Sequence, residues 1–140
     1  MIIKSDSINF HEATKIFNSF EAHLVLNSLS PRYVQLDSLR NSKLLPTYWY
    51  ANYEDYKYLH CFHITKNKKY NIFDIESPYG YGGPISNTEN QEFLDSVSDK
   101  FKNWANKKNI IAEFIRFHPL IKNYIWYLGE VSKNRKTVYI

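Results

Sequence analysis

The sequence predicts an α+β fold: one domain with a mixed, largely antiparallel sheet flanked by helices. In two stretches, polar residues that can cap a helix are followed by apolar side chains at helical spacing, which predicts two helices. The region between them is dominated by aromatic and β-branched residues in runs that are typical of strands. The length of 140 residues fits a single domain, 1–140, that buries a substantial core.

The N-terminal part is predicted to form a helix over about residues 10–27. Asn9 and Glu12 have the spacing of a capping box, and Ser30-Pro31 is expected to end the helix. Residues 33–36 predict a short strand. The apolar stripe of the helix consists of Phe10, Ala13, Phe17, Phe20 and Leu24.

Three strands are predicted next, over residues 46–52, 56–65 and 70–76, joined as an antiparallel meander with a turn at Asn67-Lys68. Their aromatic side chains suggest either stacking on sugars or bases, or a role in the core or against a partner domain. The core or partner interpretation is favoured. These aromatic residues are Tyr48, Trp49, Tyr50, Tyr53, Tyr56 and Tyr58.

The C-terminal half is predicted to contain a helix ending near Lys108 and then three strands. The helix has two competing capping boxes at its start, Thr88 to Gln91 and Ser86 to Glu89. The strands are expected over residues 110–117, 124–131 and 137–140. The buried stripe of the helix is expected to be Phe93, Val97, Phe101 and Trp104.

Residues 77–84, here called the glycine segment, contain three of the four glycines of the chain between two prolines. Their predicted position between a strand and a helix N-terminus favours an anion site, while a rigid turn is the alternative. The segment lacks the dinucleotide fingerprint and the Gly-Lys-Ser/Thr of a P-loop. Its candidate binding residues are Tyr79, Gly80, Tyr81, Gly82 and Gly83.

A second candidate cluster lies at the end of the predicted strand 110–117. Arg116 has the chemistry to bind a carboxylate or phosphate, and His118 the chemistry to act as acid or base near neutral pH. The alternatives are that Arg116 pairs with a local acid and that His118 caps a loop. No Ser–His–acid arrangement can be assigned from spacing.

Composition excludes several classes of protein. No apolar run has the length of a membrane span, and the N-terminus lacks a secretory pattern. The single cysteine, Cys61, fits a cytoplasmic location. No metal site is expected, because in a strand only two of His60, Cys61 and His63 converge on one face. Residues 100–140 hold nine Lys/Arg against two Glu, which suggests an acidic partner or simply solvated lysines.

The run Asp74-Ile75-Glu76-Ser77-Pro78-Tyr79-Gly80-Tyr81-Gly82-Gly83-Pro84, followed by a helix and Glu113-Phe114-Ile115-Arg116-Phe117-His118-Pro119-Leu120, resembles FemAB-like acyltransferases of the GNAT superfamily. The resemblance covers about residues 30–140 and matches the first of two GNAT-like domains. It implies a coenzyme A pyrophosphate loop at the glycine segment, but Ser77 replaces the usual Gln or Arg.

The resemblance implies transfer of an acyl group, from acetyl-CoA or aminoacyl-tRNA, to a cell-envelope polysaccharide, peptidoglycan sugar or peptide precursor. This chain is then expected to bind the acceptor rather than to be the complete catalyst. Its expected partners are a second GNAT-like domain or a homodimer, with no nucleic acid except tRNA. The alternatives are a non-catalytic glycan-binding or domain-docking module and, more weakly, RNA binding through the basic C-terminal third.

Overall fold

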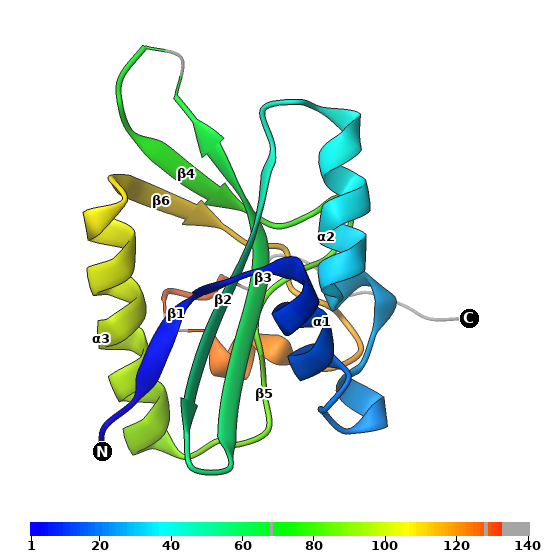
Figure 1. Cartoon of the computed structure of the whole chain (residues 1–140), viewed down its shortest axis with the longest axis vertical. Coiled ribbons are helices and arrows are strands. Elements are labelled where there is room, and N and C mark those ends of the chain that lie inside the picture. Colours follow the sequence, from blue (N-terminus) through cyan, green and yellow to red (C-terminus); the bar gives the residue numbers. More distant parts are fainter. Residues whose placement is uncertain (68, 128, 133–140) are drawn as a thin grey trace.

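The computed structural model describes residues 1–67, 69–127 and 129–132, and a six-stranded sheet forms its centre (Figure 1). The strand order is β1-β2-β3-β4-β6, and the short β5 pairs with β3. Neighbours are antiparallel except β4 and β6, which are parallel. The α+β prediction is therefore confirmed. The strands are β1 (Lys4–Ile8), β2 (Leu45–Tyr53), β3 (Tyr56–Lys66), β4 (Phe73–Glu76), β5 (Ile85–Ser86) and β6 (Ile110–Phe114).

The predicted meander corresponds to β2, β3 and β4. Trp49 pairs with His60 across β2 and β3, and His63 pairs with Glu76 across β3 and β4. β4 begins at Phe73 rather than at residue 70, because the chain turns first: Asn67 Oδ1 accepts a hydrogen bond from the Lys69 N–H at 2.9 Å. The β-type residues of this region thus form the centre of the sheet, as expected.

The first helix, α1 (Phe10–Phe17), has the predicted capping box but not the predicted length. The Glu12 N–H donates to Asn9 Oδ1 at 2.9 Å, and the Asn9 N–H donates to Glu12 Oε2 at 3.3 Å. Two 3₁₀ turns, η1 (Ala22–Leu24) and η2 (Asn27–Leu29), follow. Phe20 and Leu24 are still buried, because turns bring them to the core in place of a continuous helix.

The strand predicted over residues 33–36 is wrong, since this stretch lies in helix α2 (Pro31–Asp37), which runs into the 3₁₀ turn η3 (Ser38–Arg40). Ser30-Pro31 starts this helix instead of ending the previous one. Ser30 Oγ accepts from the Tyr33 N–H at 3.0 Å, and Pro31 occupies the first helical turn, where its missing N–H costs nothing.

Helix α3 (Gln91–Lys107) confirms the second predicted helix, with a different cap. Asn90 Oδ1 accepts from the Phe93 N–H at 2.9 Å. Both predicted capping boxes are wrong: Ser86 belongs to β5, and Thr88 Oγ1 accepts from the N–H of Asn90 itself. Of the expected stripe, Phe93, Val97 and Phe101 are buried and Trp104 is half-buried.

The strand predicted over 110–117 is shorter, because β6 ends at Phe114 and only Phe117 continues the pairing, in a parallel bridge to Gly82. The strand predicted over 124–131 is wrong at its start, where η4 (Asn123–Trp126) is a 3₁₀ helix. The strand predicted over 137–140 lies outside the described residues.

The sheet is covered by α3 on one face and by α1 and α2 on the other (Figure 1). On the α3 side, Trp49 packs edge-on against Phe101, with ring centroids 5.0 Å apart. Tyr48, Trp49 and Tyr58 are buried, which confirms the core interpretation for these three aromatic residues. Within the described residues, no helix has the length and hydropathy needed to span a membrane.

Candidate functional site

The structure brings the two predicted clusters together. The glycine segment leaves β4 and returns beside residues 115–118, where the Gly82 N–H donates to the Arg116 carbonyl at 2.8 Å. Ser77 fixes the other end, because its Oγ accepts from the Arg116 N–H at 3.2 Å. Candidate residues from two motifs more than 30 positions apart in the sequence are therefore adjacent in the fold.

The glycines are required by geometry. Gly80 and Gly83 have φ values of +88° and +103°, which L side chains rarely adopt. A Cβ on Gly82 would lie 2.7 Å from Ser77 Cβ. Gly82 and Gly83 are buried, so close packing at Gly82 and the turn of the backbone at Gly83 explain why glycine is needed there, without any ligand.

Asn123, which sequence reasoning did not select, holds the glycine segment and residues 115–118 together. It is fully buried, and its Nδ2 donates to the carbonyls of Gly82 at 2.9 Å and Pro84 at 3.3 Å. Its Oδ1 accepts from the His118 N–H at 3.0 Å. A single buried amide thus fixes the glycine segment against the chain at His118.

Tyr79 has a fixed backbone and an open side chain. Its N–H donates to Asp37 Oδ2 at 3.0 Å, and its carbonyl accepts from the Tyr33 hydroxyl at 2.8 Å. Its ring is 72% exposed. The N–H groups of Tyr79 and Gly82 both donate hydrogen bonds within the protein. In the sequence, β5 and residues 87–90 separate the glycine segment from α3. The segment therefore does not open directly onto the α3 N-terminus as the sequence predicted.

Arg116 is exposed, and its guanidinium takes part in no ion pair within the described residues. Ile115 and Phe117 lie close to the position where a Gly83 Cβ would be, so these two side chains pack on the glycine segment while Arg116 between them is exposed. No described acid pairs with it, which leaves its planar donors available for an anion.

His118 is half-buried, and its ring meets Tyr81 edge-on at 5.4 Å between centroids. Its Nδ1 accepts from the Leu120 N–H at 3.2 Å, so the neutral ring carries its proton on Nε2. Burial lowers the pKa of His118. At neutral pH the ring is therefore an uncharged Nε2–H donor, although the Nδ1 contact also fits the loop-capping alternative.

Below the glycine segment lies a buried cluster that the sequence did not reveal. His63, fully buried on β3, contacts Asp37 Oδ2 through Nε2 at 2.8 Å, and Arg40 Nε donates to Asp37 Oδ1 at 2.8 Å. Burial raises the pKa of Asp37, but the hydrogen bonds it accepts and the charge of Arg40 lower that pKa by more. Burial lowers the pKa of His63 by more than Asp37 raises it. The 2.8 Å contact and the lowered pKa values of both groups indicate that a neutral His63 donates a hydrogen bond to an ionised Asp37.

A second histidine–carboxylate pair lies on the α3 face of β3. His60 Nε2 contacts Glu113 Oε1 at 2.8 Å, and the Tyr127 hydroxyl donates to Glu113 Oε2 at 3.1 Å. Burial and the charge of Glu113 raise the pKa of Tyr127, so its hydroxyl keeps its proton. Cys61 faces the opposite side and burial raises the pKa of its thiol. Within the described residues, no three His, Cys, Asp or Glu side chains converge on a metal position.

Comparisons with known proteins add no further constraint: no protein-family profile, no curated protein and no solved structure matches this chain. The functional argument therefore depends on the geometry of the chain itself.

Proposed function

We propose that this chain is the acceptor-binding domain of an acyltransferase of the FemAB-like or GNAT type. The acyl donor, acetyl-CoA or aminoacyl-tRNA, is then held by a second GNAT-like domain. The acceptor is an amine or hydroxyl on a cell-envelope sugar or peptide precursor. The order of a helical region, a meander, a glycine segment, a helix and a strand agrees with one such unit.

One observation carries this proposal. The two motifs that resemble the family meet in space, through the 2.8 Å hydrogen bond from Gly82 to Arg116 and the Gly82–Phe117 bridge. If each motif resembled the family only by chance, there would be no reason to expect the two motifs to be neighbours in the fold. Their contact supports a single binding surface built from both.

The chemistry of this surface suits an acceptor more than a coenzyme. Tyr79 offers an exposed ring on a fixed backbone, which suits stacking on a sugar face. Arg116 offers paired donors to a carboxylate, and His118 a neutral Nε2–H. A pyrophosphate cradle, by contrast, requires free N–H groups, and those of Tyr79 and Gly82 are already bonded.

Binding of a muramyl dipeptide, followed by NMR titration, tests the proposal. Arg116→Gln is expected to weaken binding about tenfold, because it removes a charge-assisted contact to the carboxylate. Tyr79→Ala is expected to weaken it by a similar factor. Arg32→Gln, an equal change of charge at an exposed position of α2, is the control and should leave binding unchanged.

Acetyl-CoA provides the second arm of the test. The isolated chain is expected to show no thermal stabilisation by acetyl-CoA, because the donor belongs to the other domain. A clear shift in melting temperature, or muramyl dipeptide binding that is insensitive to both Arg116→Gln and Tyr79→Ala, would contradict the proposal.

A docking module is the second candidate, and exposed apolar side chains favour it. Leu39 is 78% exposed, Tyr79 72% and Phe114 67%. Leu39 precedes Arg40 in the sequence, and Phe114 pairs with Glu76 in the sheet. Arg40 and Glu76 form an ion pair, so each of these two apolar residues neighbours one end of it. A homodimer seen by sedimentation that dissociates with Phe114→Lys, but not with Ile2→Lys, supports this function; a monomer with normal glycan binding excludes it.

A further inference from the structure

A hollow lies on the face of the sheet that α3 covers. It has a volume of about 290 Å³ and is formed where the C-terminal end of α3 leaves the sheet uncovered. Four of its lining residues are apolar and come from four different strands, β2, β3, β4 and β6, which makes its floor a hydrophobic surface. They are Leu45, Ile64, Phe73 and Ile110.

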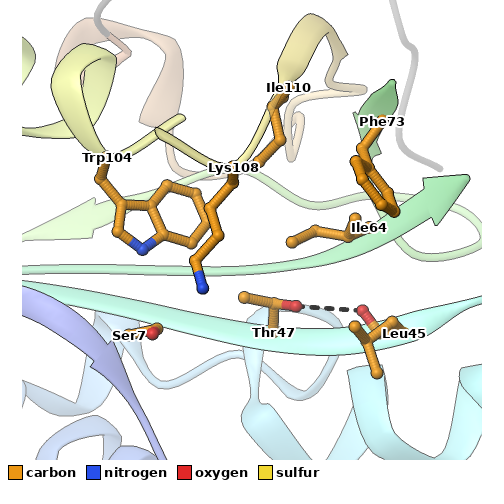
Figure 2. Close-up of a pocket in the computed structure, with 8 residues that line it drawn as sticks. All are labelled: Ser7, Leu45, Thr47, Ile64, Phe73, Trp104, Lys108 and Ile110. Carbon is orange, nitrogen blue, oxygen red and sulfur yellow. Dashed lines mark hydrogen bonds between the residues drawn. The ribbon is translucent and has the colours of Figure 1, made fainter. Parts of the chain in front are cut away.

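The remaining lining residues give this hollow a polar side. Figure 2 shows Lys108 extending from the end of α3 toward the strand that carries Thr47, with the Trp104 ring on one side and Ile64 and Phe73 on the other. Ser7 and Thr47 also line the hollow, and the Thr47 hydroxyl donates to the Leu45 carbonyl at 3.1 Å.

Two polar groups of the hollow are without partners. Lys108 is exposed, and its ammonium enters no ion pair in the parts of the chain that the structure describes. Trp104 Nε1 is buried with no hydrogen-bond acceptor among those same residues. Among the described residues the indole nitrogens of Trp49 and Trp126 are likewise buried without an acceptor, so of the two groups only the exposed Lys108 ammonium points to a ligand in the hollow.

We propose that this hollow binds a small amphipathic monocarboxylate. Its hydrocarbon tail lies on the apolar floor and its carboxylate pairs with the Lys108 ammonium. The volume is at the lower end of the range for ligand pockets, which limits the tail to a short chain.

The charges around the hollow favour an anion over a neutral or cationic ligand. No acidic side chain lines it, and Lys66 adds positive charge nearby, with Nζ 5.9 Å from the centroid of the Phe73 ring. A single lining cation and a largely apolar floor suit one carboxylate better than a phosphate, which carries more charge and needs more donors.

The test is calorimetric titration of the whole chain with octanoate, with NMR to locate the binding site. Lys108→Met keeps the apolar stem and removes the charge, so affinity for octanoate is expected to fall about fivefold. Octanol should bind the variant and the parent equally. Lys107→Met, the neighbouring lysine that does not line the hollow, is the matched control and should behave as the parent.

Tail length and a blocking variant complete the test. From butanoate through hexanoate to octanoate, affinity should rise about fourfold per added methylene. Leu45→Trp, at the exposed rim, should abolish binding of octanoate and octanol alike. NMR shifts should include the Trp104 indole. The proposal is overturned by non-saturable titration, by equal effects of Lys107→Met and Lys108→Met, or by affinity that does not change with tail length.

Discussion

The central strand β3 carries two histidine–carboxylate pairs, one on each face, and they differ in what else their carboxylates hold. Asp37 binds His63, Arg40 and the N–H of Tyr79, so this pair ties α2 to the glycine segment. Glu113 binds His60 and the Tyr127 hydroxyl, so the other pair ties β6 to the chain that follows η4.

The same kind of histidine–carboxylate pair therefore supports the candidate site on one face of β3 and the core on the other face. The two bonds to the histidines have equal length, 2.8 Å. Their consequences differ because only the Asp37 pair reaches the backbone that presents the exposed Tyr79 ring. Variants of the two carboxylates should therefore separate stability from local order at the site.

Asp37→Ala is expected to have the largest effect, a loss of about 3 kcal/mol in the free energy of unfolding. It leaves the buried His63 without its acceptor and removes the acceptor of the Tyr79 N–H. Urea unfolding measures the loss, and hydrogen exchange should show faster exchange at the Tyr79 amide. A loss below about 1 kcal/mol would show that solvent replaces these bonds.

Glu113→Ala is expected to cost about 2 kcal/mol, because it leaves the donors of His60 and Tyr127 unpaired. The same urea experiment measures it. The Tyr79 amide should keep its parental exchange rate, since its acceptor is Asp37 and Glu113 binds other partners. Equal loss of protection at Tyr79 in both variants would refute the division between site and core.

Tyr127→Phe removes one donor to Glu113 while keeping the ring, which packs on Phe117 at 5.1 Å between centroids. A loss of about 1 kcal/mol is expected, because the Glu113 side chain is 17% exposed and water can replace part of the lost hydrogen bond. Thermal unfolding gives the value. A loss as large as that of Glu113→Ala would mean that the hydroxyl, not His60, is the main partner.

The smallest effect is expected from pH, as it falls below the ordinary histidine pKa of 6.5 toward the lower folded-state pKa values of His63 and His118. Burial lowers the folded-state pKa of His63 below 6.5, so the unfolded chain takes up more protons as pH falls through that value. Stability should therefore be full above about pH 6.5 and decrease below it. His118, whose pKa burial also lowers, acts in the same direction.

Urea unfolding at each pH, repeated with His63→Gln and His118→Gln, separates these two contributions. Each variant should flatten part of the pH dependence, and the double variant more of it. A slope that is unchanged in both single variants would assign the pH dependence to other groups.

Much of the fold could be predicted because its signals are local. The capping box of Asn9 and Glu12, the meander of β2, β3 and β4, and the buried stripe of α3 all depend on neighbouring residues. The error at Ser30-Pro31 arose because the same pair can end one helix or begin the next. Here it begins α2, whose Val34 is fully buried.

The candidate site was only partly predictable. Tyr79, Arg116 and His118 were chosen for their residue types and for their places beside glycines or a proline. Asn123, Asp37 and His63 carried no such signal, because a buried Asn, Asp or His has an ordinary sequence context. Their importance follows from partners 26 to 42 positions away, which periodicity does not encode.

The sequence by itself determined the α+β class, the order of most elements and the two motifs from which the acyltransferase function is proposed. Short-range periodicity and capping chemistry are sufficient for these. Tertiary structure decided that the two motifs adjoin, that two N–H groups of the glycine segment are already bonded, and that β3 has a carboxylate partner on each face. These properties depend on contacts between distant residues, which form only when the sheet brings them together.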